Sequence, residues 1–202
     1  MKAVVILNGE PPRKARLREL AASCPVFAAD GGTEVCVRAG VKPEWVAGDF
    51  DSFPLENVPE DWERKLFPEQ DRTDFQKVLA CLPEEVDAIH VLGGLGRRID
   101  HTLTNLLIAS SLPETLQVCF EQGGERVVRI TAQAPLHLEL PVGHTLSLLP
   151  LGEVTQVQTS GLKWNLTGHT MGPGQQLGQS NQVEGPVTVQ VGRGSLFAWW
   201  ET

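Results

Sequence analysis

Between residues 3 and 120, short apolar runs alternate with stretches of helical spacing, and this order restricts the possible fold more than any other feature. Residues 3–7 form a continuous, β-branched run, which is typical of a strand buried on both faces of a parallel sheet. Further strands are expected at residues 25–29, 45–47, 66–68, 86–92 and 116–120. Helices are expected at residues 12–22, 33–39, 73–82 and 100–111. This alternation predicts an α/β fold with a doubly wound, mostly parallel sheet.

The pattern changes after about Gly123. Residues 136–140 and 187–191 alternate strictly between apolar and polar side chains, which predicts half-buried antiparallel strands. The polar, glycine-rich residues 168–178 are expected to form a loop. We therefore expect an α/β domain over residues 1–122 and a small all-β sandwich over residues 123–202.

Composition excludes several classes of protein. The formal net charge of −8 argues against nucleic acid as the main partner, because neutralising a phosphate backbone needs a basic surface. The cysteines are widely spaced and form no Cys-x-x-Cys pair, so neither structural zinc nor a disulfide framework is expected. No segment approaches the ~20 apolar residues of a membrane span, and the first apolar run is too short for a signal peptide. We expect a reduced, cytoplasmic protein that does not bind membranes.

Aspartates follow the predicted strands, next to glycines, turn formers or arginines. The carboxyl ends of parallel strands share one edge of the sheet, and ligands bind outside that edge. Two carboxylates in close contact repel by roughly 4 kcal/mol at an effective dielectric constant of about 20. Their clustering therefore suggests a hard cation, and Mg²⁺ that carries a phosphorylated ligand suits such loops. This pattern predicts an Mg²⁺-dependent enzyme of phosphate-group transfer.

Each acidic group also has a purely structural interpretation. Asp49 and Asp51 could be metal ligands or could cap local N–H groups in an Asx-turn. Asp71 and Asp74 lie at the start of a predicted helix, where they could serve only the helix dipole. Lys77 lies one turn after Asp74, and it could pair with Asp74 or contact a phosphate.

The segment that follows the strand at 86–92 combines glycines with charged residues. Residues 93–96 could form a backbone nest for phosphate oxygens, although their spacing is neither that of a P-loop nor that of a dinucleotide fingerprint. Arg98 could bind a phosphate or form a surface ion pair, and Asp100 could bind metal or cap the helix. His101 and Asn105 share one helical face, and His101 could orient substrate or be structural.

In the β-rich half, Trp164 interrupts polar neighbours and could stack on a flat heterocycle or belong to the core. Ser180 and Asn181 supply short donors and acceptors, or simply a turn.

Taken together, these segments resemble the thiamine pyrophosphokinase family, which transfers a diphosphate from ATP to the hydroxyethyl group of thiamine, giving thiamine diphosphate and AMP. The similarity runs in collinear order through nearly the whole chain. It rests on residues 30–32 (DGG), 48–52 (GDFDS), 71–77 (DRTDFQK), 93–101 (GGLGRRIDH) with Asn105, 161–166 (GLKWNL) and 180–181 (SN).

The resemblance implies an amino-terminal nucleotide-binding catalytic domain, a carboxyl-terminal thiamine-binding sandwich, and a homodimer with active sites shared between subunits. Mg²⁺ is expected at Asp49, Asp51, Asp74 and Asp100. Catalytic roles fall to Asp71, Asp74 and Arg98, either aspartate being a possible acceptor of the alcohol proton. The co-substrate ATP is expected at Asp30, Gly31, Lys77, Gly93, Gly96, Arg98, His101 and Asn105. Thiamine is expected at Trp164, Ser180 and Asn181, across the dimer.

One position departs from the family pattern, which usually carries Gly-Gly-Arg before the Asp-His step. Here Arg97 replaces the second glycine and brings a side chain and a charge close to the nucleotide loop. Two alternatives to the implied activity stay open. One is a pyrophosphokinase that acts on another alcohol, such as a hydroxymethyl pterin, and the other is a non-catalytic sensor that binds thiamine diphosphate.

Overall fold

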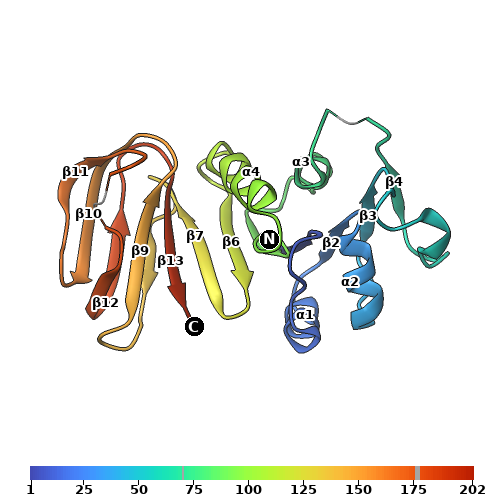
Figure 1. The fold of residues 1–202 in the computed structure, drawn as a ribbon, viewed down its shortest axis with the longest axis horizontal. Helices are drawn as coiled ribbons and strands as arrows, with labels where there is room; N and C mark the ends of the chain where they lie inside the picture. Colours follow the sequence, from blue (N-terminus) through green and yellow to red (C-terminus); the bar gives the residue numbers. More distant parts are fainter. Residues whose placement is uncertain (70, 176–177) are drawn as a thin grey trace. The chain divides into compact units, whose positions relative to one another are not determined.

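The computed structural model describes residues 1–69, 71–175 and 178–202, and it divides into two compact units (Figure 1). The first unit comprises Met1–Asn105 with Phe120–Gly123, and the second comprises Leu106–Cys119 with Gly124–Thr202. The predicted mixed α/β class is confirmed, since parallel strands and helices precede a series of antiparallel strands.

A parallel sheet forms the centre of the first unit. Its strands lie in the order β5-β1-β2-β3-β4, and every neighbouring pair is parallel. The strands are β1 (Lys2–Ile6), β2 (Val26–Ala29), β3 (Trp45–Gly48), β4 (Arg64–Leu66) and β5 (Ala88–Leu92). The side chains of Val4, Val5 and Ile6 are all buried. The continuous apolar run therefore does mark a strand covered on both faces.

Local sequence signals set the helix ends of this unit. The helices are α1 (Lys14–Ala21), α2 (Gly32–Ala39), α3 (Asp74–Leu79) and the first part of α4 (Ile99–Ser110), with a 3₁₀ turn at Leu55–Asn57. The residues of α4 from Leu106 onward belong to the second unit. Helix α2 ends at Gly40, whose φ of 65° is a left-handed conformation that glycine adopts without strain. Helix α3 begins with the predicted capping box between Thr73 and Gln76, which confirms that interpretation.

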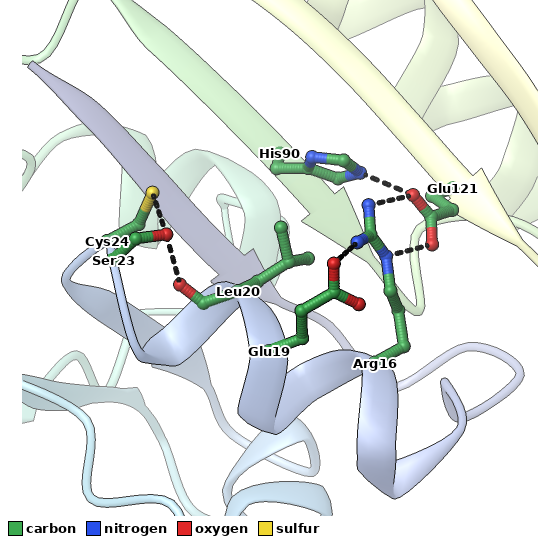
Figure 2. A network of polar contacts seen from close by, with 7 residues as sticks. All are labelled: Arg16, Glu19, Leu20, Ser23, Cys24, His90 and Glu121. Atoms are coloured by element: carbon green, nitrogen blue, oxygen red, sulfur yellow. Dashed lines mark hydrogen bonds and ion pairs between the residues drawn. The ribbon is translucent and has the colours of Figure 1, made fainter.

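A polar network fixes α1 to the strands beside it (Figure 2). The guanidinium of Arg16 donates to both carboxylate oxygens of Glu121, at 2.7 and 2.9 Å. His90 Nε2 lies 2.9 Å from the same carboxylate, and Arg16 also pairs with Glu19 on its own helix. The hydrogen bond to Glu121 raises the pKa of Arg16. This network ties α1, β5 and the last residues of β6 (Gln117–Gln122) together.

Antiparallel strands build the second unit. They are β7 (Glu125–Ile130), β8 (Leu136–Leu138), β9 (Thr145–Pro150), β10 (Val154–Leu162), β11 (Thr167–Met171), β12 (Asn181–Gln190) and β13 (Leu196–Glu201). Their order is β11-β10-β12-β9-β13-β7, and β8 also pairs with β12. The strict alternation of Val187 and Val189 with polar neighbours places both valines in the core, as predicted.

Two predictions about loops and edges were wrong in detail. The short edge strand lies at Arg64–Leu66 and not at residues 66–68, because the pairing with β3 ends where Gly48 meets Leu66. Residues 168–171, the first part of the predicted glycine-rich loop, belong to β11, since this strand pairs with β10 and Met171 is buried. Residues 176 and 177 of that loop lie outside the described residues.

Arg129 on β7 is a buried cation whose partners are main-chain carbonyls. Its side chain is only 3% exposed. The guanidinium donates to the carbonyl oxygens of Ser110, Leu112, Pro113 and Leu116 and to the Ser195 hydroxyl, at 2.5 to 3.5 Å. Burial lowers the pKa of Arg129, and the charge of Glu114 opposes that shift. Arg129 therefore gathers the end of α4 and the turn after it onto the strands of this unit.

The thiol of Cys36 is expected to resist alkylation in the native protein. It is fully buried in α2, and burial raises its pKa to about 12, so the reactive thiolate is scarce at pH 8. Cys24, Cys81 and Cys119 are partly exposed and serve as internal controls. Iodoacetamide labelling at pH 8, mapped by mass spectrometry, should modify Cys36 only after unfolding. Labelling of native Cys36 at the rate of Cys24 would contradict this assignment.

None of the helices in the described part of the chain has the length and apolar character needed to cross a membrane.

Candidate active site

An open cavity of about 570 Å³ lies at the carboxyl ends of β1, β3 and β5, in the first unit. The loops that follow these strands and the first turns of α3 and α4 line it. Its lining includes many residues singled out from the sequence, namely Asp49, Asp51, Asp74, Lys77, Gly93, Gly96, Arg98, Asp100, His101 and Asn105. These segments follow parallel strands that end at the same edge of the sheet, so residues far apart in the sequence meet there.

Three carboxylates meet beside this cavity. Asp30, Asp49 and Asp51 each offer one oxygen within 4.8 Å of the others. Asp30 is 1% exposed, and burial raises its pKa. Its Oδ2 accepts the Ser52 N–H at 3.3 Å, whereas its Oδ1 accepts no hydrogen bond from any of the described residues. An unpaired buried carboxylate oxygen beside two other carboxylates is costly without a cation, so this donor set fits a hard divalent ion such as Mg²⁺.

The backbone between Asp49 and Asp51 is not extended. Phe50, whose side chain is buried, has a φ of 61° and turns the chain between the two aspartates. The carboxylates of Asp49 and Asp51 both lie close to that of Asp30 across this turn. The structure places Asp30 in the acidic cluster, and its expected contact with the nucleotide stays a prediction.

A buried lysine partly balances the acidic charge. Lys77 on α3 is 2% exposed, and its Nζ lies 3.3 Å from Asp49 Oδ2 and 3.6 Å from Asp74 Oδ1. The pair with Asp74 that the spacing suggested is therefore present. Burial raises the pKa of Asp74, and the nearby Lys77 charge opposes the shift. One ammonium thus links two carboxylates at the floor of the cavity.

Close contact between two main-chain segments, residues 7–9 and the glycine loop at residues 93–96, shapes that loop. Gly9 N–H donates to the Gly93 carbonyl at 2.7 Å, and Gly93 has a φ of 69°. A Cβ atom at Gly93 would lie 2.3 Å from the Leu7 carbonyl oxygen, so only glycine fits there. Asn105 Nδ2 donates to the Gly94 carbonyl at 2.8 Å, which commits this buried amide to holding the loop.

Arg98 and Asp100 form a two-point ion pair at the start of α4. Arg98 Nε donates to Asp100 Oδ1 at 3.1 Å, and Nη2 donates to Oδ2 at 2.5 Å. Both side chains are exposed, and the pair lowers the pKa of Asp100. The surface ion pair considered for Arg98 is therefore present, and Asp100 lies outside the Asp30 cluster. His101 is exposed and lines the cavity.

Some residues were assigned to the site but do not line the cavity, and others were missed. Asp71 is exposed and does not line the cavity. Gly31 does not line it either. A Cβ atom at Gly31 would lie 2.3 Å from the Asn8 side chain, so glycine at this position allows Asn8 to pack against its backbone. Asn8 and Thr104 line the cavity although no motif marked them. The position of Asn8 directly after the first strand was the signal that could have identified it.

In the second unit, Trp164 is 56% exposed, so it is not a core residue. Lys163 Nζ lies 4.8 Å from the centre of its ring. Asn181 is buried, and its amide accepts the Trp164 N–H at 3.1 Å and donates to the Trp164 carbonyl at 2.8 Å. Ser180 has a φ of 55°, and its N–H donates to Ser147 Oγ. Asn181 thus positions Trp164, leaving the indole as the exposed aromatic surface.

An acidic cavity with a buried lysine, at the carboxyl edge of a parallel sheet, is typical of enzymes that transfer phosphate groups from nucleotides. Residues 17–120 match the thiamin pyrophosphokinase catalytic domain, and residues 129–196 match the thiamin pyrophosphokinase vitamin B1 binding domain. The chain belongs to the thiamine pyrophosphokinase family.

Individual relatives agree with this membership. Thiamine pyrophosphokinase 1 of Oryza sativa subsp. japonica is 30% identical over 98% of this chain and 85% of its own length. Thiamin pyrophosphokinase 1 of Caenorhabditis elegans is 25% identical over 88% of this chain and 79% of its own length. The crystal structure of thiamine pyrophosphokinase from Bacillus subtilis has a TM-score of 0.81 at 20% identity, covering 100% of this chain and 99% of that one. Thiamin pyrophosphokinase from Candida albicans has a TM-score of 0.82 at 18% identity, covering 100% and 89%. At these identities the two structures show a shared fold.

Proposed function

We propose that this chain transfers the diphosphate group of ATP to the hydroxyethyl oxygen of thiamine, giving thiamine diphosphate and AMP. Membership of the family is the main support, because both the catalytic and the vitamin B1 binding parts match. The main structural support is the buried oxygen of Asp30, which has no partner among the described residues and lies beside Asp49 and Asp51. These three carboxylates provide a binding site for the cation that ATP chemistry needs.

Mg²⁺ would be held by Asp30, Asp49 and Asp51, with Asp74 beside them, and it would neutralise charge on the ATP phosphates. Lys77 holds Asp49 and Asp74 in place and adds positive charge under the phosphates. The glycine loop at residues 93–96 presents main-chain groups to phosphate oxygens. The thiamine oxygen forms a bond to the β-phosphorus as the bond between that phosphorus and the AMP oxygen breaks.

Asp74 is the better candidate for accepting the alcohol proton. It lines the cavity, and burial raises its pKa, which makes it a stronger base than an exposed aspartate. Asp71 is exposed and outside the lining. Arg98 would contribute after exchanging its Asp100 partner for a phosphate oxygen.

Trp164 is the proposed platform for the thiamine rings, and Asn181 fixes its backbone from below. Calorimetry that compares thiamine with a hydroxymethyl pterin tests this choice of acceptor. Binding of thiamine, lost on Trp164→Ala, supports the proposal. Binding of the pterin in place of thiamine would move the protein to the alternative pyrophosphokinase activity.

We further propose a sandwich-type thiamine-binding domain over residues 123–202, a doubly wound nucleotide-binding domain over residues 1–122, and a homodimer with active sites shared between subunits. Support for the sandwich comes from β12, which pairs with β9 through its first residues and with β8 and β10 through later ones. The cytoplasmic location expected from the sequence stays a prediction.

Co-expression of two inactive variants should reveal shared sites. If one subunit supplies the ATP half and the other the thiamine half, Asp49→Asn and Trp164→Ala place their lesions in different halves of one site. A mixed dimer then contains one intact site, so activity should return in the co-purified mixture. The control is a mixture of separately purified variants before subunit exchange. Inactivity of confirmed mixed dimers would contradict the shared arrangement.

The activity itself is tested by mixing the protein with ATP, Mg²⁺ and thiamine and measuring AMP and thiamine diphosphate. Stoichiometric formation of both products is expected. Binding of thiamine diphosphate without any AMP release would identify the sensor alternative instead.

A further inference from the structure

We propose that Arg97 is a further phosphate-binding residue for the nucleotide, and that it positions the phosphate chain above the acidic cluster. This inference rests on the proposed function, because it assigns a role within the same ATP site. The proposed role of Arg97 differs from that of Arg98, because Arg98 already forms an ion pair with Asp100.

The backbone of Arg97 is held in an unfavourable conformation. Its φ is 54°, in the left-handed region, which is strained for an L-residue with a side chain. Its neighbour Gly96, with a φ of 77°, adopts the same region without that strain. Strain of this kind is concentrated at functional sites, where surrounding contacts fix the backbone. Glycine would suit position 97 better if only the loop shape mattered.

The two consecutive arginines differ in their partners. Arg98 is bound at two points by Asp100, so its charge is balanced. Arg97 has no carboxylate within ion-pair distance among the described residues, and Nη1 donates to the Asn8 carbonyl at 3.3 Å. A guanidinium held by one long bond to a carbonyl keeps most of its donors free for an anion.

The Arg97 side chain lines the cavity that contains Asp49, Asp51 and Lys77. Phosphates that meet a cation at the acidic cluster would extend past the glycine loop, where Arg97 follows Gly96. A planar guanidinium binds phosphate oxygens at two points, which fixes direction as well as charge. The hydrogen bond to the carbonyl of Asn8, which also lines the cavity, places the guanidinium beside it.

Three substitutions separate charge, hydrogen bonding and strain. Arg97→Gln removes the charge and leaves an amide donor on a shorter side chain, and Arg97→Lys keeps the charge without the two-point geometry. Arg97→Gly removes the side chain and relieves the backbone. Arg13, exposed and outside the cavity, provides Arg13→Gln as the matched control.

The measurement is calorimetric binding of Mg²⁺-ATP, repeated over a series of salt concentrations. Arg97→Gln and Arg97→Gly should each weaken ATP binding by about ten-fold and lower its salt dependence, because a charge-assisted phosphate contact is lost. Arg97→Lys should restore part of the affinity and most of the salt dependence. The control variant should bind like the wild type, and the affinity for thiamine should not change in any variant.

Wild-type-like ATP affinity in Arg97→Gln would overturn this inference and leave the proposed activity intact, provided the wild type binds ATP and releases AMP. Equal losses for ATP and for thiamine would overturn it as well, since they indicate a damaged fold. If the wild type binds no ATP, the proposed function fails and this inference fails with it.

Discussion

Replacing Asp49 with asparagine is expected to reduce Mg²⁺-dependent release of AMP by roughly 100- to 1,000-fold. Asp49 belongs to the carboxylate cluster and also forms an ion pair with Lys77. The substitution therefore removes one negative charge from the cluster and breaks that ion pair. The fold should persist, because Lys77 keeps Asp74 as a partner. A coupled AMP assay over a range of Mg²⁺ concentrations gives the result, with circular dichroism as the check on folding.

The matched control is Asp61→Asn. Asp61 is an exposed aspartate that pairs with Lys42 outside the cavity, and that contact lowers its pKa. Its replacement should leave AMP release unchanged. Unchanged AMP release in Asp49→Asn, in contrast, would remove Asp49 from the proposed metal site.

Replacing Arg129 with methionine is expected to lower the free energy of unfolding by about 3–4 kcal/mol. Methionine fills much of the buried volume but donates nothing, so the carbonyl oxygens of Leu112, Pro113 and Leu116 lose the guanidinium as a donor. Arg129→Lys should recover part of the loss, because three rotating donors cannot reproduce the planar arrangement. Chemical denaturation followed by tryptophan fluorescence measures the difference.

Arg193→Met is the control, since Arg193 is an exposed arginine in the same unit. We expect that substitution to change stability by no more than about 0.5 kcal/mol. A comparably small effect of Arg129→Met would mean that water can replace the guanidinium at these carbonyls.

The fold was predictable where one local signal determines the outcome. The apolar run at residues 3–7 predicted β1, and the Thr73–Gln76 spacing predicted the start of α3. The strand β4 was misplaced because it is short and mostly exposed, so no periodicity marks it. The strand β11 was missed because its polar, glycine-containing sequence resembles a loop, and its pairing with β10 determines its structure.

The candidate site was predictable in its residue types but only partly in its contacts. Aspartates after successive strands indicated the sheet edge, and the structure brings Asp49 and Asp51 to it. The entry of Asp30 into their cluster depends on the turn at Phe50, which spacing does not encode. Likewise, the contacts of Asn181 with Trp164 and of Asn105 with Gly94 depend on tertiary packing, so the sequence did not indicate them. The ligand contacts expected of both residues stay predictions.

The ammonium of Lys77 has a practical consequence for handling the protein. Because Lys77 already pairs with Asp49 and Asp74, we expect the fold to persist when divalent ions are removed, unlike small domains that unfold when zinc is withdrawn. Dialysis against EDTA should therefore yield an intact, dormant preparation that Mg²⁺ reactivates on addition. Such a preparation would allow turnover to be started at a chosen moment, by metal alone, with both substrates already in place.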